Sequence, residues 1–154
     1  MAIKYYWEDF HVGRVFELGT RVVGREEILA FAANYDPQSF HVDEGAAQQS
    51  IYGGLIASGW HTCAIAMRLM CDGYMLESAS LGSPGIENLR WLKPVRPGDT
   101  LRGRMTVLEA RRSASKPERG TATSKWELFN QAGELVLTMQ GIVMFGCRNP
   151  AAAG

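Results

Sequence analysis

The sequence predicts an α+β fold in a single domain, and three observations lead to that prediction. The chain has 154 residues, a length that fits one domain. The stretch from Leu55 to about Cys71 has small and apolar side chains nearly all round a helix, as expected for a buried helix. Four segments with strand-like patterns follow it, and an antiparallel sheet formed by them would supply the surface that buries this helix.

The composition argues against several classes of function. Lysine plus arginine number 16, as do aspartate plus glutamate, so no net charge attracts the chain to nucleic acid or to an anionic membrane. Cys63, Cys71 and Cys147 are too few and too far apart for a zinc site or a disulfide framework. Residues 1–10 lack the apolar core of a signal peptide, and no long apolar run predicts a membrane span. We therefore expect a cytoplasmic protein that binds neither nucleic acid nor membranes.

The first half of the chain predicts one strand and then helices. Valine, leucine and phenylalanine favour a strand over Arg14–Val23. Arg25–Asn34 predicts a helix, because its apolar residues share one face and two glutamates in the first turn suit the helix dipole. Asp36-Pro37 ends this helix, since the residue before a proline is pushed out of the helical region. Asp43 is placed to cap a short helix over Glu44–Gln49.

The second half predicts a sheet. Ser78–Gly85 is rich in serine, glycine and proline and predicts a loop, and the charged segment Arg111–Gly120 predicts a long exposed loop. Asn130–Gly133 suits a hairpin turn between the last two strands. The predicted strands are Gly85–Val95, Asp99–Ala110, Thr121–Phe129 and Glu134–Phe145. The domain is expected to span residues 1–148, followed by a flexible tail over residues 149–154.

A carboxylate and an imidazole lie five positions apart in what the sequence predicts as a non-helical segment between two helices. A turn begun by Asp36-Pro37 would let Asp36 and His41 face one substrate. Adding water to a double bond needs one proton taken from water and one delivered to carbon, and a positioned aspartate and histidine can do this near neutral pH. Two other interpretations stay open: an ordinary turn beside an unrelated histidine, or metal ligation by Asp36, His41 and Asp43.

Glycines near the start of the long helix suggest a site for a developing negative charge. Gly53-Gly54 lies just before the helix, and Ser58-Gly59 lies early in it. Free backbone N–H groups at a helix start can donate to a carbonyl oxygen that gains negative charge. Alternatively, these glycines only permit close packing of helix on sheet. No Gly-Lys-Ser/Thr follows them to form a phosphate-binding loop, and no G-x-S-x-G motif indicates a serine hydrolase.

Basic residues lie within and just after the predicted strand Gly85–Val95. Arg90, Lys93 and Arg96 could hold the phosphates of a carrier such as coenzyme A. Further cations that could take part are Arg111, Arg112 and Lys116. The alternative is that these side chains are only solvated surface residues, as basic residues beside strands usually are.

Three motifs together resemble the MaoC-like dehydratase family, also called the (R)-specific enoyl-CoA hydratases. They are Y-D-P-x-x-F-H-x-D at Tyr35–Asp43, I-Y-G-G-L-I-A-S-G-W-H at Ile51–His61, and L-R-W-L-K-P-V-R-P-G-D at Leu89–Asp99. Their order and spacing fit the family along about Tyr6–Phe145, nearly the whole chain. The first motif points to the activity, whereas the third is shared by many hot-dog proteins and supports the fold.

The resemblance implies a single hot-dog domain, in which a curved antiparallel sheet wraps a long central helix. It implies a homodimer, or a dimer of dimers or trimer of dimers, and an acyl thioester substrate in a tunnel near the subunit interface. By position, Asp36 and His41 become the acid/base dyad and the N–H of Gly59 the oxyanion donor. The residues expected to contact substrate are Tyr35, Ser58, Trp60, Arg90 and Lys93.

One departure from the family bears on the substrate range. Many of these hydratases have His-Gly where this chain has Ser58-Gly59, so the backbone donor is kept but the neighbouring side chain differs. The bulky Trp60 could shorten or reshape the acyl pocket.

The leading hypothesis is a hydro-lyase acting on a 2-enoyl thioester or the matching (R)-3-hydroxyacyl thioester. It would need no metal or redox cofactor, and coenzyme A would enter only as part of the substrate. A hot-dog thioesterase is one alternative, although thioesterases of this fold usually carry a carboxylate on the central helix and Leu55–Met70 contains none. A non-catalytic acyl-binding subunit is the other alternative, although a site that no longer catalyses a reaction would not need to keep Asp36 and His41.

Overall fold

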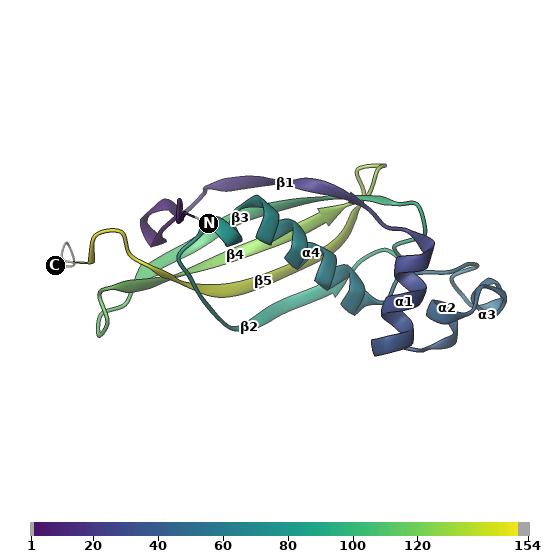
Figure 1. Cartoon of the computed structure of the whole chain (residues 1–154). Helices are drawn as coiled ribbons and strands as arrows, with labels where there is room; N and C mark the ends of the chain where they lie inside the picture. Colours follow the sequence, from purple (N-terminus) through teal and green to yellow (C-terminus); the bar gives the residue numbers. More distant parts are fainter. Residues whose placement is uncertain (1, 151–154) are drawn as a thin grey trace.

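Five antiparallel strands form one sheet, in the order β1-β3-β4-β5-β2. The protein is represented by a computed structural model that describes residues 2–150. In chain order the elements are β1 (Val15–Val22), α1 (Arg25–Tyr35), α2 (Ser39–Val42), α3 (Glu44–Gln49), α4 (Gly59–Gly73), β2 (Ser80–Trp91), β3 (Thr100–Arg112), β4 (Arg119–Phe129) and β5 (Leu135–Gly146), with 3-10 turns at Trp7–Asp9 and Met75–Glu77. The sheet curves around α4, and α1, α2 and α3 gather beyond one end of it (Figure 1).

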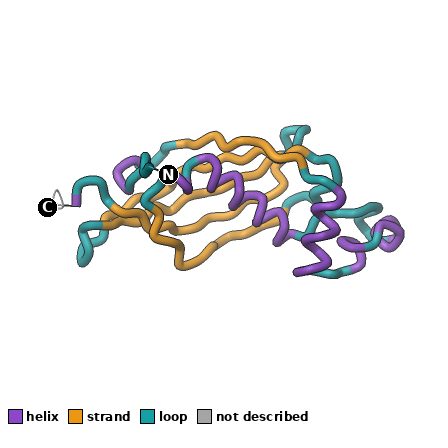
Figure 2. Tube along the Cα trace, viewed as in Figure 1, coloured by secondary structure: helices purple, strands orange, loops and turns teal. Residues whose placement is uncertain are grey.

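Figure 2 shows α4 lying along one face of the sheet, and the buried core residues come from this helix and from the strands. Along β4, buried and half-buried positions alternate over the whole strand, because successive side chains point to opposite faces. The face of α4 toward the sheet buries Ile65, Ala66, Leu69 and Met70. The predicted α+β fold and its hot-dog arrangement, with a curved sheet around a central helix, are therefore confirmed.

The long helix differs from its prediction in start and in burial. It begins at Gly59 rather than Leu55, and Ser58 is its N-cap. The residues before it are buried but extended, because the backbone N–H of Ala57 donates to the carbonyl of Val95 at 2.8 Å. The expected burial all round the helix is also wrong for the single chain, since Trp60 is 59% exposed and Met67 is 43% exposed.

The expected loop at Ser78–Gly85 is largely strand. β2 begins at Ser80 and pairs with β5 from Ser80 opposite Phe145 onward. Its register shifts between Ser80 and Gly82 and again between Gly82 and Gly85, and an edge strand accommodates such bulges, as well as Pro84. The strand ends at Trp91 rather than Val95. Glycine and proline therefore mark irregularities in an edge strand here rather than a loop.

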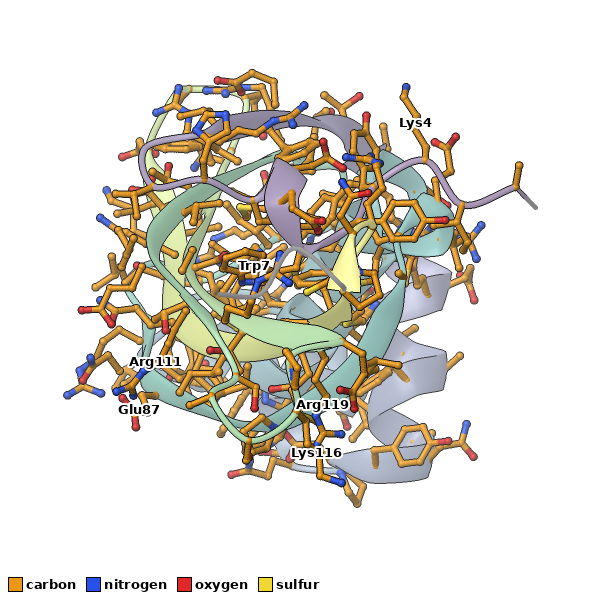
Figure 3. All side chains as sticks on the ribbon, turned by 90° about the vertical axis from the view of Figure 1, so that its left-hand side faces the viewer. Lys4, Trp7, Glu87, Arg111, Lys116 and Arg119 are labelled. Atoms are coloured by element: carbon orange, nitrogen blue, oxygen red, sulfur yellow. The ribbon has the colours of Figure 1, made fainter. Side chains whose placement is uncertain are left out.

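The expected loop at Arg111–Gly120 is also shorter, since β3 runs to Arg112 and β4 starts at Arg119. This hairpin lies at the end of the molecule that faces the viewer in Figure 3, where Arg111, Lys116 and Arg119 project from the outside of the ribbon. Trp7 lies across the same end, and its Nε1 donates to the carbonyl of Thr121 at 3.0 Å.

The remaining local predictions have mixed outcomes. The hairpin turn at Asn130–Gly133 is confirmed, with Gly133 N donating to Asn130 O at 3.0 Å. The capped helix α3 is confirmed, and the Asp43 carboxylate accepts from Ala46 N at 3.0 Å. The segment before it is not wholly non-helical, because Ser39–Val42 forms the short helix α2.

The C-terminal prediction falls partly outside the described residues. Within the expected tail, Asn149 N donates to the Glu8 carboxylate at 2.8 Å, and residues 151–154 are not described. Among the helices within residues 2–150, none is long and apolar enough to cross a membrane.

Candidate active site

Asp36 and His41 meet where α1 ends and α2 begins. Asp36 caps α1, Pro37 prevents the helix from continuing, and α2 then turns the His41 ring back. His41 Nε2 lies 3.4 Å from Asp36 Oδ2. His41 is 4% exposed, so both groups sit largely out of bulk water. The two residues that the sequence singled out therefore form a close pair.

The orientation of the His41 ring is set by a backbone carbonyl. His41 Nδ1 lies 2.7 Å from Ile56 O, in the extended segment before α4. A carbonyl oxygen only accepts, so Nδ1 carries the hydrogen. In the neutral ring, Nε2 is then a free acceptor that points at the Asp36 carboxylate. This contact fixes both the position and the tautomer of the imidazole.

Two side chains donate to Asp36, one to each oxygen. Ser58 Oγ donates to Oδ2 at 2.7 Å, and Gln38 Nε2 donates to Oδ1 at 2.7 Å. Burial acts to raise the pKa of Asp36, but these hydrogen bonds, together with the positive charge that His41 carries when protonated, outweigh burial and hold that pKa below its usual value. Asp36 is therefore ionised at neutral pH.

Gly59 is the first residue of α4, so its N–H has no acceptor within the helix. The Trp91 indole lies over this glycine, and a Cβ added to Gly59 would come within 2.5 Å of it. Trp91 Nε1 also donates to the carbonyl of Gly59 at 2.8 Å. The helix start and the end of β2 are thus held together, and only glycine fits between them.

These groups line one pocket of about 550 Å³. Its floor contains the dyad and Gly59, and Trp60 and Trp91 pack edge to face at 5.3 Å as part of its wall. The other lining residues are Gln38, Phe40, Tyr52, Ile56, Ala57, Thr62, Leu92, Lys93, Pro94 and Val95. The pocket thus combines a dyad, a helix N-terminus and a lining of both apolar and polar side chains.

Comparison with known proteins identifies the family. The family model described as MaoC like domain matches residues 9–127, well over half of the chain. This chain belongs to the MaoC-like dehydratase family. The resemblance found in the motifs is thereby confirmed.

Three relatives illustrate the range of this MaoC-like family. The uncharacterized protein YdeM of Bacillus subtilis is 31% identical over 124 residues, covering 80% of this chain and 86% of YdeM. The crystal structure of the MaoC-like dehydratase from Rhodospirillum rubrum is 42% identical, with a TM-score of 0.87, covering 94% of this chain and 99% of that one. The (R)-hydratase from A. caviae, involved in PHA biosynthesis, is 25% identical, with a TM-score of 0.70, covering 86% and 95%. These findings support a hydratase or dehydratase, that is, a hydro-lyase.

The other predicted site residues of this MaoC-like chain lie in different places. Trp60 and Lys93 line the pocket, and Lys93 pairs with Glu134. Tyr35 is 74% exposed on α1 and does not line the pocket. Arg90 is exposed and donates to the carbonyl of Leu89 at 2.8 Å. Ser58 is fully buried behind the lining residues.

The other basic residues considered from the sequence do not line the pocket. Arg96 donates to the carbonyl of Tyr52 at 2.5 Å and is partly buried. Arg111, Arg112 and Lys116 belong to the β3–β4 hairpin, at the end of the molecule opposite α1 (Figure 1). Within one chain, this hairpin therefore does not contribute to the pocket, because the strands carry it away from the dyad.

Sequence reasoning missed several groups that shape this site. Gln38 lies two positions after Asp36, a spacing at which a side chain can reach back across a turn. Trp91 is part of the third motif, but nothing in the sequence indicates that its indole covers Gly59. Ile56 acts through its carbonyl, so its identity gives no signal at all.

A second polar pair lies away from the pocket. His61 is buried on α4, and its Nε2 contacts Glu27 Oε1 of α1 at 3.1 Å. Burial acts to raise the pKa of Glu27, but His61 and Arg21 outweigh it and lower that pKa. Among residues 2–150, no three acidic, histidine or cysteine side chains group as metal ligands, and Asp43 caps α3 instead.

Proposed function

We propose that this chain reversibly hydrates a 2-enoyl thioester to a 3-hydroxyacyl thioester. The observation that carries the proposal is the Asp36–His41 pair in a pocket that also contains the N-terminus of α4. Both facing atoms of the pair, Oδ2 and Nε2, are acceptors when the ring is neutral. A water molecule can donate one hydrogen to each of them, so the pair suits the binding and activation of water.

The proposed reaction moves one proton in a closed cycle. As the water oxygen bonds to the β-carbon, the pair takes one water proton, and the electrons of the double bond move toward the thioester carbonyl. The N–H of Gly59 and the positive end of the α4 dipole stabilise the resulting enolate oxygen. The pair then returns its proton to the α-carbon. Atoms and charge balance in this step without a metal or redox cofactor, and coenzyme A would enter only as part of the substrate.

The pocket wall suits an acyl thioester. Phe40, Trp60 and Trp91 offer apolar surface for the acyl group, and Lys93 lies on the same wall as a cation for the polar part of the carrier. Arg90 is a further exposed cation at the end of β2. A phosphate would have to compete with Glu134 for Lys93. Because Lys93 would bind the carrier and not the reacting atoms, we expect its replacement to change KM rather than kcat.

We also propose a second copy of this chain as the partner that completes the enzyme. β2 is an edge strand, and nearly all of it is exposed. Leu81, Ile86 and Trp91 are each about half exposed along it, and Met67 and Trp60 extend the apolar surface onto α4. The surface is continuous with the pocket wall at Trp60 and Trp91. Exposed apolar surface beside an unpaired strand edge is typical of a protein interface.

A thioesterase is less well supported by the same geometry. The only carboxylate in α4 belongs to Asp72, in its last turn. Asp72 Oδ2 accepts from Arg68 at 3.0 Å on the exposed side of the helix, far along α4 from Gly59. No carboxylate of the central helix therefore faces the pocket.

The decisive test is hydration of crotonyl-CoA, followed as loss of the enoyl thioester absorbance. We expect activity in the wild type and a fall of about 10²–10⁴-fold in both variants, because Asp36→Asn removes the basic carboxylate and His41→Ala removes the imidazole. Asp43→Asn and His11→Ala are matched controls, since asparagine still caps α3 and His11 is exposed.

Two results would overturn the proposal. Full activity in Asp36→Asn would remove the dyad from the chemistry. A wild type that binds acyl-CoA but hydrates none of a panel of short, long, branched and carrier-protein-bound enoyl thioesters would favour the non-catalytic acyl-binding subunit.

A further inference from the structure

Ser58 is the one residue of the predicted site that is fully buried. It stands between the extended segment that holds Ile56 and the first residue of α4, Gly59. It does not line the pocket, so a substrate there would not reach its side chain. In the chain, however, Ser58 is next to Gly59, the proposed oxyanion donor, and two residues after Ile56, whose carbonyl orients His41.

The Ser58 hydroxyl both donates and accepts a hydrogen bond within the site. Its single hydrogen is donated to Asp36 Oδ2 at 2.7 Å, the same oxygen that faces His41 Nε2. Its oxygen accepts from Trp60 N at 3.3 Å, which satisfies a free N–H in the first turn of α4. The hydroxyl therefore connects the carboxylate of Asp36 directly to the helix that carries Gly59.

We propose that Ser58 is a positioning residue that holds the ionised Asp36 carboxylate at the N-terminus of α4, the helix that begins with Gly59. The proposal rests on the proposed function and adds a residue to it, because Ser58 acts through Asp36 and not on the substrate. It also gives a role to serine at the position before Gly59, where we expect histidine in many of these hydratases. In this chain, the residue at that position binds the Asp36 carboxylate.

The charged and polar groups around Asp36 define how Ser58 acts. His41 faces it from α2, Gln38 donates from the turn between α1 and α2, and Ser58 donates from the start of α4. Burial opposes the charge of Asp36, so its pKa stays low only while these donors remain. Gln38 is exposed, and water can replace its donor, whereas nothing in the fold replaces that of buried Ser58.

The test is the pH profile of kcat/KM for crotonyl-CoA in the full-length wild type and Ser58→Ala. We expect the acid limb of the profile to move up by about one to two pH units, because a hydrogen bond to the ionised form is lost. The loss of activity should therefore be larger at pH 5 than at pH 8. Gln38→Leu should move the limb by less, and Ser58→Thr, which keeps a hydroxyl, should restore it toward the wild-type position.

A second readout does not depend on catalysis. The Asp36 carboxyl is titrated by carbon NMR, with Asp36→Asn identifying its signal, and its pKa should rise in Ser58→Ala. This rise is expected even if crotonyl-CoA is not a substrate, so failure of the proposed function remains distinguishable. Ser58→Gly serves as the control for capping, because glycine is well tolerated at an N-cap yet cannot donate to Asp36.

The outcome that overturns the proposal is a folded Ser58→Ala or Ser58→Gly enzyme with an unmoved acid limb and an unmoved Asp36 titration. Ser58 would then only cap α4. A shifted titration in both variants, with recovery in Ser58→Thr, supports the positioning role.

Discussion

Individual residues in this site are defined by what surrounds them more than by their own chemistry. Asp36 is an ordinary carboxylate that burial alone would push toward the neutral acid, and Ser58 and Gln38 reverse that tendency. His41 is an ordinary imidazole whose tautomer is chosen by the Ile56 carbonyl. A common aspartate and a common histidine thereby become a pair that accepts both hydrogens of one water molecule.

At the same scale, we predict that Gly59→Ala disables the enzyme without unfolding it. The added Cβ would come within 2.5 Å of the Trp91 indole, so the ring must move away from the start of α4. Overpacking of this kind costs about 1–3 kcal/mol in the free energy of unfolding. Hydration activity should fall at least tenfold, and the near-UV circular dichroism of tryptophan should change.

The control for this prediction is Gly24→Ala, because a Cβ added there meets no atom within 4 Å. Normal activity and an unaltered tryptophan spectrum in Gly59→Ala would show that the close contact with Trp91 is unimportant.

At the scale of elements, α1 and α4 carry the two halves of the site. Asp36 follows α1, Gly59 begins α4, and the two helices meet through Glu27 and His61. The Phe31 ring of α1 also stacks on His61 at 4.7 Å. The distance between the base and the oxyanion donor therefore depends on a polar contact between helices as well as on the Ser58 hydrogen bond.

We predict that Glu27→Leu destabilises the protein by about 1 kcal/mol, measured by urea unfolding. The buried His61 Nε2 would lose its partner, and the low end of the range applies because Glu27 is one-third exposed. Glu26→Leu is the matched control, since that side chain is 86% exposed. Equal stability of the two variants would mean that the Glu27–His61 contact contributes nothing.

Two element boundaries escaped sequence reasoning for one physical reason. β2 starts in a segment of serine, glycine and proline because β5 is available to pair with it, and α4 starts late because Ala57 pairs with Val95. Local propensity favoured a loop in the first case and a helix in the second. Backbone hydrogen bonds to segments distant in the sequence overrode it in both.

At the scale of the whole molecule, the two edge strands of the sheet differ. β1 and β2 both carry exposed apolar residues, among them Val22 and Leu81. Only β2 adjoins the pocket, through Trp91. A second copy placed along β2 would cover the exposed face of α4 and the Trp60–Trp91 wall together.

We predict that light scattering finds at least a dimer for the wild type and a smaller species for Leu81→Lys. A lysine on the half-exposed edge would oppose close packing of an apolar interface. Val22→Lys on the opposite edge is the matched control and should keep the wild-type mass. A monomeric wild type, or a Leu81→Lys variant of unchanged mass, would contradict the proposed interface.

The sequence by itself predicted the fold class, the order of the five strands and of the helices α1, α3 and α4, and the pair Asp36 and His41. These predictions rest on the periodicity of hydrophobic residues, on the proline that ends a helix, and on motifs that lie within one short segment of the chain. Only the tertiary structure decided that Ser58 donates to Asp36, that Ile56 orients His41 and that Trp91 covers Gly59. Each of these contacts joins residues 15 or more positions apart, and hydrogen bonds across such separations exist only once folding has brought the segments together.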